Sequence, residues 1–384
     1  MKRRIKVLQL QPDFNVKHHS FADLAEQIVL SLPASDYEVV SAFLKGRPAG
    51  DDPVSRAERS VYFDFSDAQL KGARLRALWR LFRFCREERF DVVICNRFKP
   101  VNMMLLLNRW LRIPLCIGIA HNLGDYERSY RRRQVSLRAD AHWRFVGVSA
   151  AVRDELIGYG SGFTPQNTVA ITNAIDIDQA ESLQLDRDAA RQALGLSATA
   201  RVIGTIGRQV PVKGYRYLVQ AFARIADRHA DAQLILIGDG REHAGLKDEV
   251  ARLGLEGRVL LPGMRPYAMQ YVRAFDVWIM PSLAEGFPLA LLEGMSGRLP
   301  VIASDIPSMH ELVAGAEGLL VPPTDVDALA EAMDCYLAVS PDELRSKGGR
   351  CYNYLKAHHG ISEYRAAYRK LIESGLRANT EGER

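Results

Sequence analysis

Cysteine is scarce in this sequence, and its spacing excludes two common kinds of site. The 384 residues include five cysteines, an odd number, and no two of them form a C-x-x-C pair. This pattern argues against a disulfide framework and against a zinc site, and it favours a reducing compartment. We therefore expect a cytoplasmic protein without a zinc site.

Long apolar runs are also missing. The longest, VNMMLLLNRWLRIPLCIGIA, is interrupted by Asn108, Arg109 and Arg112, so it is too polar to cross a bilayer. The opening, MKRRIKVLQLQPDFN, has only a short apolar segment before Gln, Pro and Asp, which is typical of a first strand and not of a signal peptide. The protein is predicted to be soluble or peripheral to a membrane.

Several familiar nucleotide and nucleophile signatures are absent as well. No G-x-G-x-x-G follows the first expected strand, and the sequence has no Walker motif and no serine elbow. GTIGRQVPVKG does not have the spacing of a dinucleotide fingerprint. A nicotinamide enzyme is therefore disfavoured, and we expect no cofactor.

Positive charge is concentrated in the first half of the chain. Residues 1–175 hold 27 Lys and Arg against 18 Asp and Glu, a net of +9, whereas the remainder holds 24 against 28, a net of −4. Such an asymmetry indicates that the first half faces an anionic partner and the second does not.

Short apolar segments alternate with longer amphipathic ones along the chain. This pattern predicts an α/β protein with parallel sheets covered by helices on both faces. The expected strands are Ile5–Leu10, Glu38–Phe43, Asp91–Cys95, Leu115–Ala120, Arg144–Val148, Thr168–Ile171, Val202–Ile206, Gln233–Ile237, Val259–Leu261, Asp276–Met280, Val301–Ala303 and Gly318–Val321.

The alternation pauses in the polar segment NAIDIDQAESLQLDRDAARQALGL. The length exceeds what one core usually organises, so we place a domain boundary near residue 176. Ligands of open parallel sheets bind beyond the carboxyl ends of the strands, and with two such domains a cleft between them is the expected place.

A pair of cations follows the first strand of the second half. In VIGTIGRQVPVKGYRYLVQAF, Arg208 comes directly after the strand and Lys213 stands just before a helix that starts near Tyr215. Two cations and flexible glycines at a strand-to-helix turn suit a diphosphate. By itself the pattern is about equally consistent with a solvated turn.

Two carboxylates stand eight positions apart in an otherwise apolar segment, AEGFPLALLEGMSGRLP. Glu285 lies in a loop, Pro288 is predicted at the first position of a helix, and Glu293 is the one charge on that helix. The helix N-terminus can bind phosphate oxygens, and a buried carboxylate suits the vicinal hydroxyls of a ribose. The structural alternative makes Glu285 a capping acid and pairs Glu293 with an internal arginine.

His121 follows the expected strand Leu115–Ala120 directly. A lone histidine after a strand is more often structural than catalytic, so this signal is weak on its own.

These segments together resemble a retaining glycosyltransferase of family 4 with the GT-B fold. GRQVPVKG resembles the family's diphosphate-binding Arg and Lys, EGFPLALLE its E-x7-E motif, and LILIGDGREHAGLKDEVARLGLEGRVLLPGMR its middle strands. GVSAAVRDEL and ITNAIDID are similar to its interdomain strand and linker. The match covers nearly all of the second half and parts of the first.

The resemblance implies two Rossmann-like domains that face each other across a cleft. The N-terminal, acceptor-binding domain would comprise residues 1–175 plus 361–378, because the last helix crosses back. The C-terminal, donor-binding domain would comprise residues 176–360.

The resemblance also implies roles for individual residues. Glu285 and His121 would lie at the donor sugar and the reacting carbon, Glu293 would hold the ribose, and Arg208 and Lys213 would stabilise the leaving diphosphate. The rest of the donor site would comprise Gly263, Met264, Gly286, Phe287, Pro288 and Leu289. The donor would be a UDP- or GDP-sugar, the reaction would be metal-independent, and the configuration at the anomeric carbon would be retained.

One loop departs from the family pattern. Family members often carry a Gly-Gly pair after the first strand, whereas this chain has Lys17, His18, His19 and Ser20 in QPDFNVKHHSFADLA. We assign these four residues only an acceptor-side role.

The acceptor is predicted from the basic first half. KGARLRALWRLFRFCREERF mixes arginines with Leu75, Leu78, Trp79, Phe82 and Cys85 at helical spacing. This suits an anionic inner-membrane surface or a lipid-linked, lipopolysaccharide-type glycan, although an amphipathic helix that covers a sheet shows the same stripe. Nucleic acid is disfavoured. The alternatives are a sugar-nucleotide epimerase or phosphorylase of the same fold and a non-catalytic nucleotide-sugar-binding scaffold.

Overall fold

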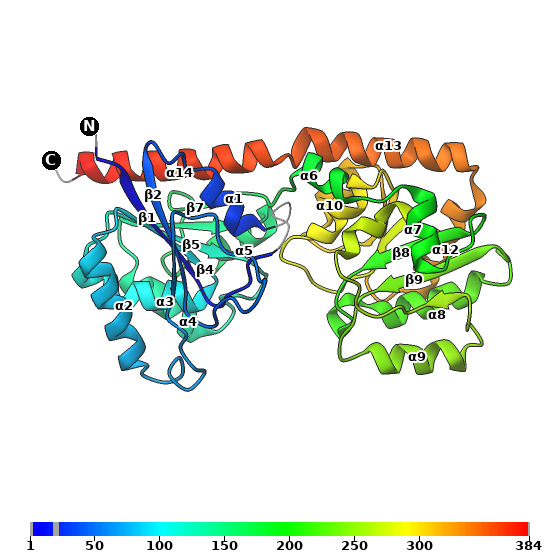
Figure 1. Cartoon of the computed structure of the whole chain (residues 1–384), viewed down its shortest axis with the longest axis horizontal. Coiled ribbons are helices and arrows are strands. Elements are labelled where there is room, and N and C mark those ends of the chain that lie inside the picture. Colours follow the sequence, from blue (N-terminus) through cyan, green and yellow to red (C-terminus); the bar gives the residue numbers. More distant parts are fainter. Residues whose placement is uncertain (1–2, 18–22, 383–384) are drawn as a thin grey trace. The chain divides into compact units, whose positions relative to one another are not determined.

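The structure is a computed structural model that describes residues 3–17 and 23–382. The chain forms two compact units, Met1–Asn173 with Ile361–Arg384, and Ala174–Gly360 (Figure 1). Each unit is a parallel sheet with helices around it.

The first unit contains a seven-stranded sheet of order β3-β2-β1-β4-β5-β6-β7. All neighbouring strands are parallel, because every connection crosses over. The strands are β1 (Ile5–Gln11), β2 (Tyr37–Phe43), β3 (Arg59–Tyr62), β4 (Val92–Asn96), β5 (Leu115–Ala120), β6 (Trp143–Gly147) and β7 (Thr168–Ala170).

In its described part, this unit has six helices. They are α1 (Leu24–Leu30), α2 (Leu75–Glu88), α3 (Phe98–Leu111), α4 (Ser129–Arg138), α5 (Ala150–Tyr159) and α14 (Ile361–Gly382). The C-terminal α14, red in Figure 1, packs on the blue α1, where Tyr364 donates a hydrogen bond to the carbonyl of Leu24. The last helix is therefore part of the N-terminal unit.

The second unit contains a six-stranded sheet of order β10-β9-β8-β11-β12-β13, again entirely parallel. Its strands are β8 (Arg201–Ile206), β9 (Ala232–Ile237), β10 (Val259–Leu260), β11 (Val277–Met280), β12 (Val301–Ser304) and β13 (Leu319–Val321). The order reverses between β8 and β11, so this is the switch point at which ligands of doubly wound sheets bind.

The helices of the second unit cover both faces of its sheet. They are α6 (Ile177–Leu183), α7 (Arg187–Leu194), α8 (Tyr215–Ile225), α9 (His243–Arg252), α10 (Leu289–Ser296), α11 (His310–Gly315), α12 (Val326–Ala338) and α13 (Pro341–His358), with the 3-10 helices η2 (Pro211–Lys213) and η3 (Ala268–Ala274). Helix α8 turns Leu218, Phe222 and Ile225, all fully buried, toward the strands. This spacing of apolar residues makes α8 a covering helix.

The predicted α/β, doubly wound fold is confirmed. All twelve predicted strands are present, with ends that differ by one residue or less. The apolar pattern did not predict β3, a four-residue edge strand whose side chains are exposed or half-buried. A strand that buries neither face carries no apolar run for a pattern to detect.

Among the described residues, no helix is both long and apolar enough to cross a membrane.

Candidate functional site

The two predicted donor motifs occupy the loops that follow β8 and β11. These strands are neighbours, with Val277 beside Ile203 and Trp278 beside Gly204. Because both strands end at the switch point, their loops lie side by side. The motifs are far apart in the sequence, and the sheet brings them together.

An ion pair joins the motifs. Lys213 Nζ lies 2.6 Å from Glu285 Oε1, and the two side chains keep only 18% and 15% of their exposure. The pair explains how a carboxylate is tolerated in this apolar segment. Each charge balances the other at a position that is largely shielded from water. The partner of Glu285 belongs to the protein itself, and the capping role considered for this residue does not describe its contact.

The backbone holds the two loops together as well. The amide of Leu283 donates a 2.7 Å hydrogen bond to the carbonyl of Val212. Gly214 adopts a left-handed conformation with φ of +68°, and a Cβ there would lie 2.0 Å from the carbonyl oxygen of Pro281. Only glycine permits both the turn and this approach, so Gly214 sets the position of Lys213 next to it.

Tyr215 is buried next to the Lys213–Glu285 pair. Burial, together with the nearby charge of Glu285, raises the pKa of this phenol to about 12, although a hydrogen bond with Thr205 acts in the opposite direction. A Cβ at Gly207 would lie 2.6 Å from the Tyr215 hydroxyl oxygen. Tyr215 therefore stays a neutral hydrogen-bonding group that fills the base of the turn.

Gln209 lies at the centre of this edge of the sheet, and the sequence analysis did not identify it. It is fully buried, its Nε2 donates to the carbonyl of Leu236, and its Oε1 lies 2.6 Å from Nδ1 of His243. Its backbone accepts from the amide of Glu242 and donates to the carbonyl of Asp239. A polar residue inside a Gly- and Lys-containing turn gives no sequence signal of burial.

The remaining donor candidates lie at the same edge. Gly263, with φ of +75°, accepts a 2.9 Å hydrogen bond from the amide of Gly238, and Met264 beside it is 79% exposed. The Phe287 ring lies 5.6 Å from the ring of His359. Gly286 and Pro288 are buried, and Leu289 is half-buried.

Helix α10 begins one residue later than predicted. Pro288 is its N-cap rather than its first helical residue, and Leu289 opens the helix. Glu293 lies one turn inside and is half-buried. Its binding to a ribose stays a prediction, as do the donor contacts of the other residues at this edge.

His121 lies in the first unit, directly after β5. Its Nε2 is 3.2 Å from Oδ1 of Asn96, and its backbone amide donates to Asp125. Since an amide oxygen only accepts, the neutral ring carries its proton on Nε2 and keeps a lone pair on Nδ1. Burial of the ring, together with the positive charge of Arg97, lowers its pKa to about 4, although the charge of Asp125 acts in the opposite direction.

Asn96 is a second residue that the sequence analysis passed over. It ends β4, it is buried, and its Nδ2 has no hydrogen-bond partner among the described residues. The signal was present, because Asn96 is a polar residue directly at the end of a predicted strand. The same rule identified His121.

The pKa of His121 leads to a testable pH dependence. Between pH 6.5 and pH 4 the unfolded chain binds a proton at this residue and the folded chain does not, so folding stability falls as the pH is lowered through this window. We expect an NMR titration of the His121 ring to have its midpoint near 4, with His121→Asn used to assign the resonance. A midpoint near 6.5 would contradict the buried environment described here.

The acceptor-side candidates are only partly described. The backbone amide of Lys17 donates a 3.0 Å hydrogen bond to Asp23, which also caps α1. His18, His19 and Ser20 lie outside the described residues. Their acceptor-side role stays a prediction.

Two family profiles match the chain. The profile described as Glycosyl transferases group 1 matches residues 200–338, and the one described as Glycosyltransferase Family 4 matches residues 24–179. Each match falls mainly within one of the two units.

Relatives and solved structures agree with the profiles. The UDP-Gal:alpha-D-GlcNAc-diphosphoundecaprenol alpha-1,3-galactosyltransferase of Escherichia coli is 26% identical over 302 residues, which are 73% of this chain and 76% of that protein. The lipopolysaccharide core biosynthesis mannosyltransferase LpsB of Rhizobium meliloti is 30% identical over 183 residues, 46% of this chain and 52% of that protein. HepE of Anabaena, solved in complex with UDP, has a TM-score of 0.77 at 21% identity, over 96% of this chain and 100% of that one.

Two doubly wound parallel sheets, with the Lys213 and Glu285 loops at the switch point of the second, are typical of the GT-B class of glycosyltransferase. Within that class, the chain belongs to the group 1 glycosyltransferases of family 4.

Proposed function

We propose that this protein is a retaining glycosyltransferase that moves a sugar from a nucleotide-sugar donor to a lipid-linked or lipopolysaccharide-type glycan. The observation that carries the proposal is the Lys213–Glu285 pair at the switch point of the second sheet. The pair places a cation beside a carboxylate. The cation can bind the diphosphate of a donor, and the carboxylate can accept hydrogen bonds from its sugar hydroxyls.

The chemistry of the pair fits this reaction. Negative charge develops on the diphosphate as it leaves, and a positioned ammonium stabilises that charge better than water does. Arg208 is exposed two residues into the same loop, and its fork suits a second phosphate oxygen. These cations belong to the chain, so the proposed mechanism needs no metal ion.

The donor is proposed to be a UDP- or GDP-sugar. The E. coli relative is named for UDP-Gal and HepE was solved with UDP, which supports a uridine nucleotide. The proposed site of action is the cytoplasmic side of the inner membrane, in the assembly of cell-surface polysaccharide.

A thermal-shift screen of UDP-, GDP- and ADP-sugars tests donor binding. A ligand at 100 times its Kd adds about 2.7 kcal/mol to the free energy of unfolding, so the true donor raises the melting temperature in proportion to the logarithm of its concentration. We expect this rise in the wild type and a smaller rise in Lys213→Ala, which keeps part of its donor binding. No shift with any nucleotide sugar would contradict the proposal.

Further measurements separate the alternatives. An epimerase converts the donor without an acceptor, a phosphorylase needs inorganic phosphate, and a scaffold binds without turnover. The anomeric configuration of a transferred sugar, read by NMR, decides whether the reaction is retaining.

The acceptor side of the proposal rests on helix α2. Its Ala77, Leu81 and Cys85 are buried and cover the sheet, as the structural alternative predicts. Leu75 and Trp79, however, are 74% and 57% exposed, so the covering role does not explain them. The helix therefore carries a second apolar stripe, with arginines beside it.

The exposed stripe suits an anionic membrane. Arg83 lies over the ring of Trp79 at 5.3 Å, and Arg76 and Arg80 are exposed on the same helix. Apolar side chains flanked by arginines insert at the boundary between headgroups and acyl chains. We propose that α2 brings the acceptor-binding unit to the membrane that carries a lipid-linked acceptor.

A vesicle experiment tests this contact. Leu75→Ser with Trp79→Ser is expected to weaken binding to phosphatidylglycerol-rich vesicles by at least ~10-fold, because burying each side chain contributes about 1.5–3 kcal/mol. Val54→Ser is the control, since Val54 is 62% exposed in an acidic loop of the same unit. Equal binding by both variants in a sedimentation assay would refute the contact.

A further inference from the structure

The second unit holds a cavity at the edge of its sheet opposite to the donor loops. The cavity measures about 340 Å³ and lies where strands begin: Arg201 opens β8, Asp276 precedes β11 and Pro300 precedes β12. The donor loops follow the other ends of β8 and β11. Since β8 has six residues, the two places are about 20 Å apart.

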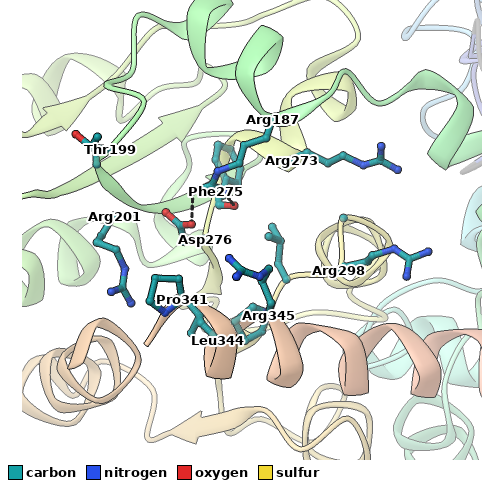
Figure 2. A pocket seen from close by; sticks show the side chains of 14 residues that line it. Arg187, Thr199, Arg201, Arg273, Phe275, Asp276, Arg298, Pro341, Leu344 and Arg345 are labelled. Carbon is teal, nitrogen blue, oxygen red and sulfur yellow. Dashed lines mark hydrogen bonds and ion pairs between the residues drawn. The ribbon is translucent and has the colours of Figure 1, made fainter. Parts of the chain in front are cut away.

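Arginine dominates the lining of this cavity. The five arginines are Arg187, Arg201, Arg273, Arg298 and Arg345. Figure 2 shows them spread around the opening, with Arg201 to the left, Arg345 rising from α13 below, and Arg273 and Arg298 extending to the right. They come from α7, β8, η3, α13 and the turn after α10, so the fold gathers them and no sequence motif does.

The one carboxylate in the lining is already engaged. Asp276 Oδ1 lies 2.5 Å from Arg187 Nη2, and its Oδ2 accepts from Arg191 at 2.8 Å and from the amide of Val202 at 2.7 Å. Figure 2 marks the contact with Arg187. Asp276 therefore does not neutralise the other arginines of the lining.

Two of those arginines have no carboxylate partner among the described residues. Arg201 donates to the carbonyls of Tyr336 and Val339, and Arg273 donates to the side-chain amide oxygen of Gln184. The Nε of Arg201 is buried and has no hydrogen-bond partner in the part of the chain that the structure describes. These acceptors are neutral, so two positive charges beside the cavity stay unbalanced.

The other two arginines have weak or exposed partners. Arg298 lies 3.4 Å from Glu181, with 58% of its side chain exposed. Arg345 pairs with Asp342, and both side chains are largely exposed, at 70% and 87%. Exposed pairs contribute little, so a ligand can replace either partner at small cost.

The floor of the cavity is apolar. Phe275, Leu299 and Leu344 line it and are buried. Low-dielectric walls strengthen the field of surrounding charges, and several guanidinium groups around one hollow match the oxygens of a phosphate. The volume is at the lower end of the range for small-molecule sites, which leaves room for a phosphate with a small organic body.

We propose that this cavity is a second ligand site, which binds a phosphate ester at the amino-terminal edge of the sheet. The ester comes either from a soluble metabolite or from the headgroup of an anionic lipid. The site is separate from the donor loops and does not depend on the proposed reaction.

Calorimetry on the full chain tests the site. Glycerol 3-phosphate is expected to bind the wild type, and Arg273→Gln with Arg345→Gln is expected to lower the affinity at least tenfold. Arg345→Gln alone is a safer variant, because that side chain is largely exposed, and it is expected to cause a part of the loss.

Two control variants make the result specific. Arg350→Gln removes an arginine from the same helix α13, where it pairs with Glu317 outside the cavity, and it is expected to leave the affinity unchanged. Arg208→Gln with Lys213→Gln removes the donor-loop cations and is also expected to leave it unchanged. No binding by the wild type, equal loss in Arg350→Gln, or loss only in the donor-loop variant would overturn the proposal.

Vesicles identify the source of the phosphate. If the protein binds vesicles of phosphatidic acid more tightly than glycerol 3-phosphate, the site is assigned to a lipid headgroup. This tighter binding should be lost in Arg273→Gln with Arg345→Gln. The reverse preference assigns it to a soluble ester. Binding to polyglutamate alone, with neither phosphate probe bound, would overturn the proposal in favour of an acidic protein partner.

Discussion

Replacing Lys213 with Ala is expected to lower kcat for sugar transfer about 10²- to 10³-fold. The Lys213 ammonium lies at the switch point of the second sheet, 2.6 Å from Glu285. Under the proposed mechanism it meets the charge that develops on the leaving diphosphate, so its loss raises the barrier more than it weakens donor binding. Steady-state kinetics with separate kcat and KM values measure this difference.

The second half of this experiment is a double-mutant cycle. Glu285→Ala alone is expected to reduce kcat by a similar factor, and the double variant is expected to lose much less than the product of the two, because the residues act as a unit. Lys347→Ala is the control: it removes a lysine paired at 3.7 Å with Glu343 on α13 and should leave transfer unchanged. Full activity in both Lys213→Ala and Glu285→Ala would rule out the assigned site.

Replacing Gly214 with Ala is expected to damage both stability and activity. The left-handed backbone at φ of +68° costs a side chain about 1–2 kcal/mol, and the new Cβ would lie 2.0 Å from the Pro281 carbonyl oxygen. The Cβ position is fixed by the backbone and the carbonyl belongs to it, so neither can rotate away: one loop has to shift, and Lys213 shifts with it. A displacement of about 1 Å at a reacting site can cost 10²-fold in rate.

Gly257→Ala provides the matched comparison. Gly257 has a similar φ of +78° in the same unit, but a Cβ there has nothing within 4 Å. Gly257→Ala should lower the free energy of unfolding only by the cost of placing alanine in a left-handed conformation. It should not lower the activity. Equal unfolding midpoints for the two variants in a denaturant titration, with transfer intact in Gly214→Ala, would show that the approach of the two loops is unimportant.

The strands were predictable because each buries a continuous apolar run between two layers of helices. Val202–Ile206 and Asp276–Met280 illustrate this, since the observed strands differ from them by one residue. Strand β3 was not predicted, because an exposed edge strand does not need a continuous apolar run. The predicted stripe on α2 is not one face: the structure buries Cys85, together with Ala77 and Leu81, and leaves Leu75 and Trp79 exposed.

The candidate site was predictable in its parts and not in its connections. Arg208, Lys213 and Glu285 are polar residues in the loops that follow apolar strands, which is a local signal. That Lys213 pairs with Glu285, 72 residues later, depends on the order of strands in the sheet. Gln209 and its contact with His243 depend on the same arrangement.

The sequence by itself determined the class of the protein: apolar runs of strand length, glycines at turns and cations or carboxylates just beyond them. These features are local, because backbone preference and burial act over a few residues. Only the tertiary structure decided which charges are balanced. It brought Lys213 to Glu285 and engaged Asp276 with two arginines, and among the residues that the structure describes it left Arg201 and Arg273 without a carboxylate. The energy of a charge depends on its neighbours in space and on the water around it, and a local stretch of sequence reveals neither of these.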